Sequence, residues 1–465
     1  MPMSAFPNMP SSHPTWYEFR SSEGFITVVV ALAAFTDNFL YGLIVPVTPT
    51  ALERRVGTDP QDVQRLVSLL LALEAFAWLV TSPITGHVAD RIKSRRTPLL
   101  AGLPALVIST ALLYVGDSLL LWVIGRILMG VSAAVTWTVG LALLVDTTDR
   151  ERLGETLGYM SMGMMVGTTA GPLLGGVIYK AGGYHSVFGA AFALIFVDAV
   201  LRLAMLEKKQ IRSADGGEEA ITEPLLPATE SGNVSDRPNY GIAGEASVEP
   251  CDDAADEKWS SPIFVLLSMP RIRICLWAYC VISMSLTAFD SALPLFVRDT
   301  FSWSQLGQGL IFLPLSATQV FDPVTGIICD KYPNKRGYIA AVAFVAAGAS
   351  FCALRIVTHD SLAQKIVLCV LLGLLGLSVS FAVPPILVSI QETLDDKAKD
   401  DVGAFGSGGA VALAYGLVNS AFAVGALLGP LMGGYLRSVA GWGTMTLVLA
   451  LANGATGAVM LRMRC

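Results

Sequence analysis

Two glycine-rich stretches with an internal proline occur in this chain, one in each half. Gly167-Thr-Thr-Ala-Gly-Pro-Leu-Leu-Gly-Gly176 returns as Gly425-Ala-Leu-Leu-Gly-Pro-Leu-Met-Gly-Gly434, which places the two prolines 258 residues apart. A second pair, Pro83–Arg91 and Pro323–Lys331, shares Pro, Thr, Gly and Asp at an offset of 240. Paired Gly/Pro-interrupted apolar segments are typical of membrane proteins built from two repeats. The pattern predicts two homologous bundles that face each other.

Composition supports a membrane protein. The 465 residues are 53% hydrophobic and 15% charged, whereas soluble domains carry about 25% charged residues. Apolar runs of ~20 residues, the length that crosses a bilayer, recur along the chain. We expect an all-α membrane protein with twelve transmembrane helices in two pseudo-symmetric six-helix bundles. The expected spans are roughly 24–47, 66–86, 97–116, 119–145, 156–179, 186–206, 272–297, 305–328, 337–357, 364–390, 406–435 and 440–461.

The same pattern divides the chain into four parts. We expect an N-terminal tail over 1–23, a six-helix bundle over 24–206, a linker over 207–270 and a second bundle over 271–465. The linker is rich in Gly, Ser, Pro, Asp and Glu and buries too little apolar surface to offset its ordering entropy, which predicts disorder.

Basic residues predict the orientation, because cytoplasmic loops retain Lys and Arg. Arg91, Arg95 and Arg96 follow the second span, and Lys331 and Arg336 follow the eighth. We therefore expect both termini in the cytoplasm. The membrane is predicted to be the plasma membrane, with a vacuolar or vesicular membrane as the alternative.

Several function classes find no support in the sequence. The seven cysteines show no CxxC and the four histidines are not spaced as a metal pair, so no metal, no cofactor and no enzymatic activity are expected. Nothing indicates nucleic-acid binding. The expected partners are the lipid bilayer, protons and a small organic substrate, and the chain is expected to be monomeric.

Charged residues inside the first six spans are candidates for function, since each costs from about 2.5 kcal/mol upward in the bilayer. Asp37, Glu74 and Arg126 lie at similar predicted depths. One base can neutralise one acid, and the remaining carboxylate would take up a proton readily in an apolar setting. The alternative is a static buried ion network.

The second half offers two further candidates for proton coupling or substrate binding, Asp290 and Asn419. Asp290 lies near the outer end of span seven. Asn419 lies in span eleven, where it forms hydrogen bonds but does not titrate.

A latch is predicted at the cytoplasmic end of span two. We expect Asp90 to cap the start of the next helix, while Arg91 and Arg95 reach neighbouring helix ends and carboxylates such as Asp146. Gly86 and, in the second half, Asp322, Asp330 and Lys331 complete this gating set. The alternative is that the arginines only set the topology.

The glycine-rich helix is predicted to bend and to approach a neighbour closely. Pro172 removes a backbone hydrogen bond, and small residues let two helices come together. The candidates are Gly167, Gly171, Gly175 and Gly176, with Gly429 and Pro430 in the second half.

These motifs together resemble the twelve-span drug:proton antiporter branch of the major facilitator superfamily. Asp37-Asn38 with Pro46-Val-Thr-Pro49 is similar to the first span of vesicular amine transporters and their fungal relatives. Gly125-Arg-Ile-Leu-Met-Gly130 resembles the family's span-four motif, which implies a role in proton coupling for Arg126. The Gly167–Gly176 stretch resembles the span-five antiporter motif, which implies export by exchange.

The chain also departs from the vesicular amine transporters. Glu74 stands where they have a lysine, and Asn419 stands where they have an acid. A monoamine cargo is therefore not expected.

We expect a secondary active transporter that exports a drug, toxin or secondary metabolite by alternating access, driven by the proton gradient because no ATP-binding motif is present. The alternatives are a proton-linked uptake permease of the same fold and a membrane sensor that does not transport.

Overall fold

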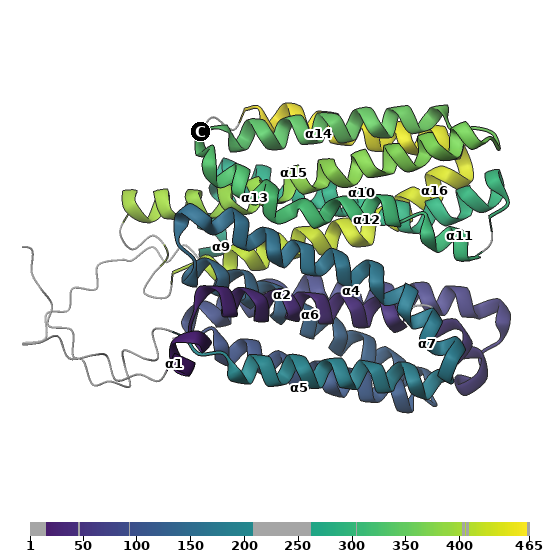
Figure 1. The fold of residues 1–465 in the computed structure, drawn as a ribbon, viewed down its shortest axis with the longest axis horizontal. Coiled ribbons are helices and arrows are strands. Elements are labelled where there is room, and N and C mark those ends of the chain that lie inside the picture. The colour runs from purple at the N-terminus through teal and green to yellow at the C-terminus, as the bar shows by residue number, and fades with distance from the viewer. Residues whose placement is uncertain are drawn as a thin grey trace, which may run out of the picture.

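The computed structural model describes residues 15–44, 47–92, 94–207, 262–303, 305–401, 405 and 409–462. In these residues the regular structure is helical, with two bundles of elongated helices lying side by side (Figure 1). The first bundle is purple to teal and the second is green to yellow. The tail 1–14, Pro46 and linker residues 208–261 lie outside the described residues.

The first bundle ends in a helix too long for one membrane crossing. Its elements are α1 (Thr15–Arg20), α2 (Glu23–Ile44), α3 (Thr48–Ala51), the π-helix η1 (Leu52–Val56), α4 (Pro60–Arg91), α5 (Arg96–Val115), α6 (Leu119–Thr147), the short 3-10 helix η2 (Arg150–Arg152) and α7 (Leu153–Ala204). α7 has 52 residues, but the backbone leaves the helix at Gly183 with φ 72°. This positive φ suits glycine, and it divides α7 into two crossings.

The second bundle repeats this arrangement. Its elements are α9 (Pro262–Ser268), α10 (Pro270–Phe301), α11 (Gln305–Leu310), α12 (Leu313–Ala317), η3 (Thr318–Phe321), α13 (Asp322–Lys331), η4 (Pro333–Lys335), α14 (Arg336–Ala353), η5 (Leu354–Ile356), α15 (Leu362–Asp400) and α16 (Val411–Met460). α16 has 50 residues and reverses at Gly441, where φ is 82°. Gly441 is the counterpart of Gly183.

Ten helices among the described residues are long and apolar enough to cross a membrane. Two of them, α7 and α16, contain a reversal, so the fold is consistent with the twelve crossings expected. Three local expectations differ from the structure. Span 305–328 is broken into α11, α12, η3 and α13, α15 continues past 390 to Asp400, and α9 makes the expectation of disorder wrong for 262–268.

The glycine-rich stretches pack each long helix against the first long helix of its own bundle. A Cβ built on Gly171 would lie 2.6 Å from the Phe39 carbonyl oxygen of α2. In the second bundle, a Cβ on Gly429 would lie 2.5 Å from the Met284 carbonyl oxygen of α10. The backbones are therefore close enough that only glycine fits. The two sequence repeats make the same contact in three dimensions.

Gly176 does not take part in this contact. A Cβ on Gly176 would have no neighbour within 4 Å, and the same holds for Gly434. Gly167, Gly171 and Gly175 recur at every fourth residue and share one helix face, whereas the next residue is turned by about 100°. The expected close approach holds for the first three positions, and at Gly176 the expectation is wrong.

This difference gives a matched pair of substitutions. We expect Gly171→Leu to destabilise the first bundle by about 1–3 kcal/mol or more, because the added side chain meets the backbone of α2. We expect Gly176→Leu to leave stability nearly unchanged, since its side chain enters open space. Thermal unfolding of the purified variants in detergent measures both effects. Equal losses in the two variants would contradict the packing described here.

Candidate functional site

Asp90, at the end of α4, joins the first bundle to the second. Its Oδ1 accepts a hydrogen bond from Ala412 N at 2.9 Å and its Oδ2 accepts one from Leu413 N at 2.8 Å. These amides open α16 and have no partner within their own helix, and a helix start favours negative charge. The sequence predicted a cap on the next helix, α5, but the capped helix lies in the other bundle.

Asp330 forms the equivalent joint in the opposite direction. Its two carboxylate oxygens accept hydrogen bonds from Gly154 N and Glu155 N, each at 2.9 Å. These amides open α7 of the first bundle. The two aspartates with their helix starts are called the latches below. The end of the molecule where they lie is the latch end, and the opposite end is the far end.

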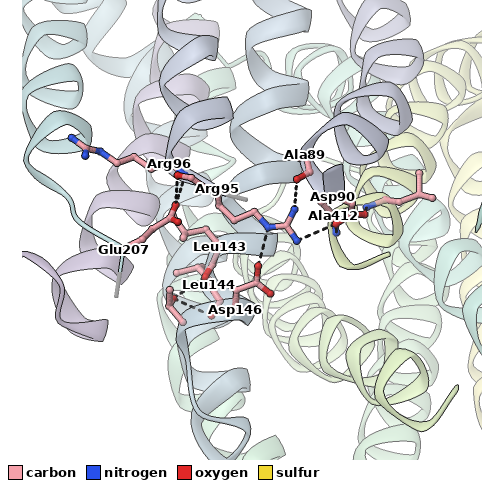
Figure 2. A network of polar contacts seen from close by, with 12 residues as sticks. Ala89, Asp90, Arg95, Arg96, Leu143, Leu144, Asp146, Glu207 and Ala412 are labelled. Carbon is pink, nitrogen blue, oxygen red and sulfur yellow. Dashed lines mark hydrogen bonds and ion pairs between the residues drawn. The ribbon is translucent and has the colours of Figure 1, made fainter. Parts of the chain in front are cut away.

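Arg95 holds the first latch in place (Figure 2). It donates from Nη2 to Asp90 Oδ1 at 3.0 Å, from Nε to Asp146 Oδ2 at 2.8 Å and from Nη1 to the Ala89 carbonyl oxygen at 2.6 Å. One guanidinium thus ties α4 to α6 and orients the Asp90 carboxylate. Arg91 is exposed and forms no hydrogen bond or ion pair with the described residues, so the expectation for Arg91 is wrong.

Arg336 has the corresponding place in the second latch, and the sequence prediction missed it. Its Nε donates to the Cys329 carbonyl oxygen at 3.0 Å, its Nη2 lies 3.7 Å from Asp330 Oδ1, and it pairs with Glu392. Arg336 follows its aspartate by six residues and Arg95 by five, which hides the match at a fixed offset. Lys331 lies instead beside Tyr332, with its ammonium 5.7 Å from the ring centroid.

The bundles also touch backbone to backbone next to the latches. A Cβ on Gly86 would lie 2.5 Å from the Ala412 carbonyl oxygen, and one on Gly158 would lie 2.6 Å from the Asp322 carbonyl oxygen. The joint therefore requires small residues on both sides. Gly86, predicted as part of the gating set, has this role.

The first latch can be tested by removing its carboxylate. We expect Asp90→Ala to raise the ratio of open to closed latch ends about tenfold or more, because charged hydrogen bonds contribute roughly 1.5–3 kcal/mol each. Spin labels at the exposed positions 91 and 399 report the separation of the bundles.

Asp395→Ala is the matched control for this experiment. Asp395 also pairs across the bundles, with Arg150 at 3.0 Å, but both side chains are substantially exposed, and exposed pairs contribute little. A distance distribution in Asp90→Ala that equals the distribution in Asp395→Ala would show that the Asp90 latch does not hold the bundles together.

Glu207 extends the network from the first latch to the start of the linker (Figure 2). Its Oε1 accepts hydrogen bonds from Arg96 N, at the start of α5, and from Ser94 Oγ. The side chain is buried at 6% exposure, and burial raises the pKa of its carboxyl despite these hydrogen bonds. The cap that the sequence assigned to Asp90 is therefore supplied to α5 by Glu207, from a segment predicted to be disordered.

Glu207 offers a pair of substitutions with opposite outcomes. We expect Glu207→Ala to speed hydrogen exchange of the Arg96 amide about 5- to 30-fold, because the amide loses its acceptor at a cost of roughly 1–2 kcal/mol. Glu207→Gln keeps an acceptor oxygen and should keep the protection.

The wild-type contact should also depend on pH. Since burial raises the pKa of the carboxyl above 4.5, the buried position of Glu207 is most favourable at low pH and becomes less so as the pH rises through the raised value, although the hydrogen bond from Arg96 N by itself favours the carboxylate. Glu207→Gln should lose this dependence after correction for intrinsic exchange rates. A pH response that persists in Glu207→Gln would assign it to another group.

Inside the first bundle, Arg126 pairs with Glu74. Arg126 Nη1 lies 2.8 Å from Glu74 Oε2, and its Nη2 donates to Thr48 Oγ1 at 3.1 Å. Both charged side chains are buried, which makes an unpaired partner costly. Thr48 was not predicted from the sequence, because its hydroxyl reaches the site only through the fold of α3.

Asp37 does not form an ion pair with Arg126. It is 5% exposed, and its Oδ1 has no hydrogen-bond partner among the described residues. Arg202 acts on the carboxyl electrostatically from a distance, as do the like charges of Glu74 and Asp198, and the Trp137 indole of α6 lies within reach of a hydrogen bond to it. The structure thus brings together two of the three predicted residues as a pair, with Asp37 nearby and unpaired.

A further buried ion pair was missed by the sequence prediction. Arg202 Nε donates to Asp198 Oδ1 at 3.0 Å, and Arg202 Nη1 donates to the Leu99 carbonyl oxygen at 3.1 Å. The pair ties the last crossing of α7 to α5. Its spacing of four residues on one helix was the signal available.

The two candidates in the second half occupy different settings. Asn419 is buried, and its Nδ2 donates to Thr138 Oγ1 of α6 at 3.1 Å, so it links the bundles. Asp290 is exposed on α10 toward the far end. Asp290, Glu74 and Arg126 all act electrostatically on the Tyr41 hydroxyl, so these charges from both bundles surround one region.

The described residues offer no metal site. No three His, Cys, Asp or Glu side chains gather within this part of the chain. A cavity of about 20 Å³ lies inside the second bundle, with Ser285, Ser378 and Asn453 among its lining residues. This volume accommodates about one water molecule rather than an organic cargo.

Comparison with known proteins identifies the family. The family model described as Major Facilitator Superfamily matches residues 30–412 and 320–464. The chain belongs to the Major Facilitator Superfamily. It is 30% identical to the uncharacterized MFS-type transporter C18.02 of Schizosaccharomyces pombe, with 91% of each chain covered. It is 24% identical to the vesicular acetylcholine transporter of Torpedo marmorata, over 96% of this chain and 83% of that one.

A solved structure supports the fold. The crystal structure of the human organic anion transporter MFSD10 (TETRAN) superimposes with a TM-score of 0.64 at 16% identity, covering 94% of this chain and 99% of that one. The fold and the family together make this chain a multi-pass membrane transporter and not an enzyme. The resemblance to this superfamily inferred from the motifs is confirmed.

Proposed function

We propose that this protein is a proton-coupled transporter that exports a small organic molecule by alternating access. The observation that carries the proposal is the unpaired carboxyl of Asp37, which lies buried beside the Glu74–Arg126 pair. An ionised carboxylate without a partner is costly in a membrane interior, so Asp37 binds a proton when its surroundings are dry. Access to water then releases the proton.

The latches support alternation between two states. Their hydrogen bonds join the bundles at the latch end, where α16 and α7 begin. Toward the far end, Tyr41 and Asp290 are both exposed although they lie on long helices that face each other's bundle. In the proposed cycle this is the state open toward the far end, and breaking the latches gives the other state.

The charge of the latch end supports the proposed direction of transport. Arg95, Arg150, Arg152, Lys335 and Arg336 gather there, which supports a cytoplasmic location for this end. Protons then enter from the far end, outside the cytoplasm, and reach Asp37. Cargo enters from the cytoplasm when the latches open, which makes the exchange an export.

The proposal leaves the charge of the cargo open. One relative is named for acetylcholine, and the structural neighbour is named for organic anions. Asp37, Glu74 and Asp290 lie in the proposed region of transport together with Arg126, so the proposal includes charges of both signs. A broad probe panel is therefore appropriate.

Transport in proteoliposomes with an imposed pH gradient tests the proposal. Radiolabelled acetylcholine, ethidium and a fluorescein anion serve as probes, and the protein orientation is fixed by protease treatment. We expect at least one probe to move uphill against proton flow in the wild type. We expect Asp37→Asn to abolish uphill movement while keeping probe binding, because Asn keeps the volume and cannot titrate.

Asp360→Asn is the control, since Asp360 is exposed, pairs with Lys365 at 2.8 Å and lies away from the bundle interior. Uphill transport by Asp37→Asn at the wild-type rate would remove Asp37 from the mechanism. Movement of a probe together with protons would establish uptake, and gradient-independent binding without movement of any probe would favour a sensor.

A further inference from the structure

Asp322 is a second buried carboxyl without a charged partner, and it lies in the other bundle. It begins α13, is 2% exposed, and its Oδ1 has no hydrogen-bond partner among the described residues. Gln319, one turn earlier, is 1% exposed, and its Oε1 also has none. Two neighbouring buried acceptors without donors are rare in folded proteins. If the carboxyl is ionised, this site therefore has fewer hydrogen-bond donors than acceptors.

The neighbouring hydroxyl of Ser380 makes the same point. Ser380, on α15, lies within reach of the Asp322 side chain, where a hydrogen bond donated by its hydroxyl would favour the carboxylate, but its Oγ donates to the Thr318 carbonyl oxygen at 3.2 Å. A hydroxyl has one proton to donate and two lone pairs that accept. A protonated Asp322 can donate to Ser380 Oγ, which then remains free to donate to Thr318. The neutral acid satisfies this chain of hydrogen bonds, whereas beside the carboxylate Ser380 has one proton for two acceptors.

The surroundings provide no compensating charge. Among the described residues, no Lys or Arg forms an ion pair with Asp322. The packed helices bring Tyr279 from α10, Ser380 from α15 and the backbone of Gly158 from α7, none of which is a cation. The nearest latch carboxylate, Asp330, lies eight residues along α13, about 12 Å away. Asp322 is thus dry and isolated.

Asp322 also lies against the moving joint. Its carbonyl oxygen and the Cα of Pro323 face Gly158 of α7, where a Cβ would approach to 2.6 and 2.7 Å. Thr325 Oγ1 lies 2.8 Å from the carbonyl oxygens of Asp322 and Ser380 and shares its one proton between them, which fixes this turn. When α13 separates from α7, water can therefore reach the Asp322 carboxyl.

We propose that Asp322 is a second proton-binding carboxyl of the transport cycle, neutral while the latch end is closed and ionised once α13 and α7 separate. The proton passes to water at the latch end and leaves the carboxylate behind. The sequence analysis placed Asp322 in the gating set without a titrating role. This inference rests on the proposed function, to which it adds a proton site in the second bundle.

Infrared spectroscopy of the full-length protein in lipid membranes tests the proposal without a cargo. The C=O stretch of a protonated carboxyl is separate from the bands of a carboxylate. At neutral pH we expect Asp322→Asn to lose the band area of one carboxyl relative to the wild type. Asp322→Glu should restore that area at a shifted frequency, and the exposed Asp360→Asn should change nothing.

Ser380→Ala keeps the test decisive if Asp322→Asn fails to fold. Loss of the Ser380 acceptor should move the Asp322 band to higher frequency, because the neutral acid loses its hydrogen bond. Spectra of Asp322→Asn and Ser380→Ala that match the wild type would overturn the proposal for Asp322. Proton-driven transport by the wild type with those unchanged spectra refutes this inference alone. A wild type that ignores a pH gradient refutes the proposed function, and with it a role for Asp322 in coupling.

Discussion

A carboxylate bound to the free amides of a helix start is the contact on which the architecture depends. Asp90 and Asp330 each bind the opening turn of a helix in the opposite bundle, at 2.8–2.9 Å. The amides would otherwise lack partners, and the dipole of the helix adds to the attraction. When the bundles move apart, water can form hydrogen bonds with both the carboxylate and the amides. The joint is therefore strong enough to hold one state and weak enough to open.

Much of the fold could be predicted because the sequence contains two repeats that adopt the same arrangement. Gly171 and Gly429, each before a proline, and the aspartates at 90 and 330 mark equivalent points, and the structure places them in equivalent contacts. Helix lengths followed from apolar runs, since a bilayer imposes one length. The cost of buried charge predicted that Arg126 pairs with one of two acids, but the choice of Glu74 over Asp37 came only from the structure.

The rest depended on contacts between segments far apart in the chain. Asp90 was expected to cap α5, but it caps α16, and Glu207 caps α5 instead. Local sequence gives the capping residue and not the helix that receives it. Gly176 resembled its neighbours in composition, but helix geometry turns it away from α2. Arg336 was hidden by a single-residue difference between the two loops.

The buried carboxyls have two different roles: those of the latches join the bundles, and those of Asp37 and Asp322 are the proposed proton sites. In the latches, both oxygens of each carboxylate accept hydrogen bonds from backbone amides, and Arg95 or Arg336 pairs with the same carboxylate. Asp37 and Asp322 each keep an oxygen without a partner, one in each bundle. A proton is the smallest ligand that completes such a group, and only a change of surroundings removes it. Under the proposed mechanism, the latches therefore define the two states, and the incomplete carboxyls make the balance between them depend on protons.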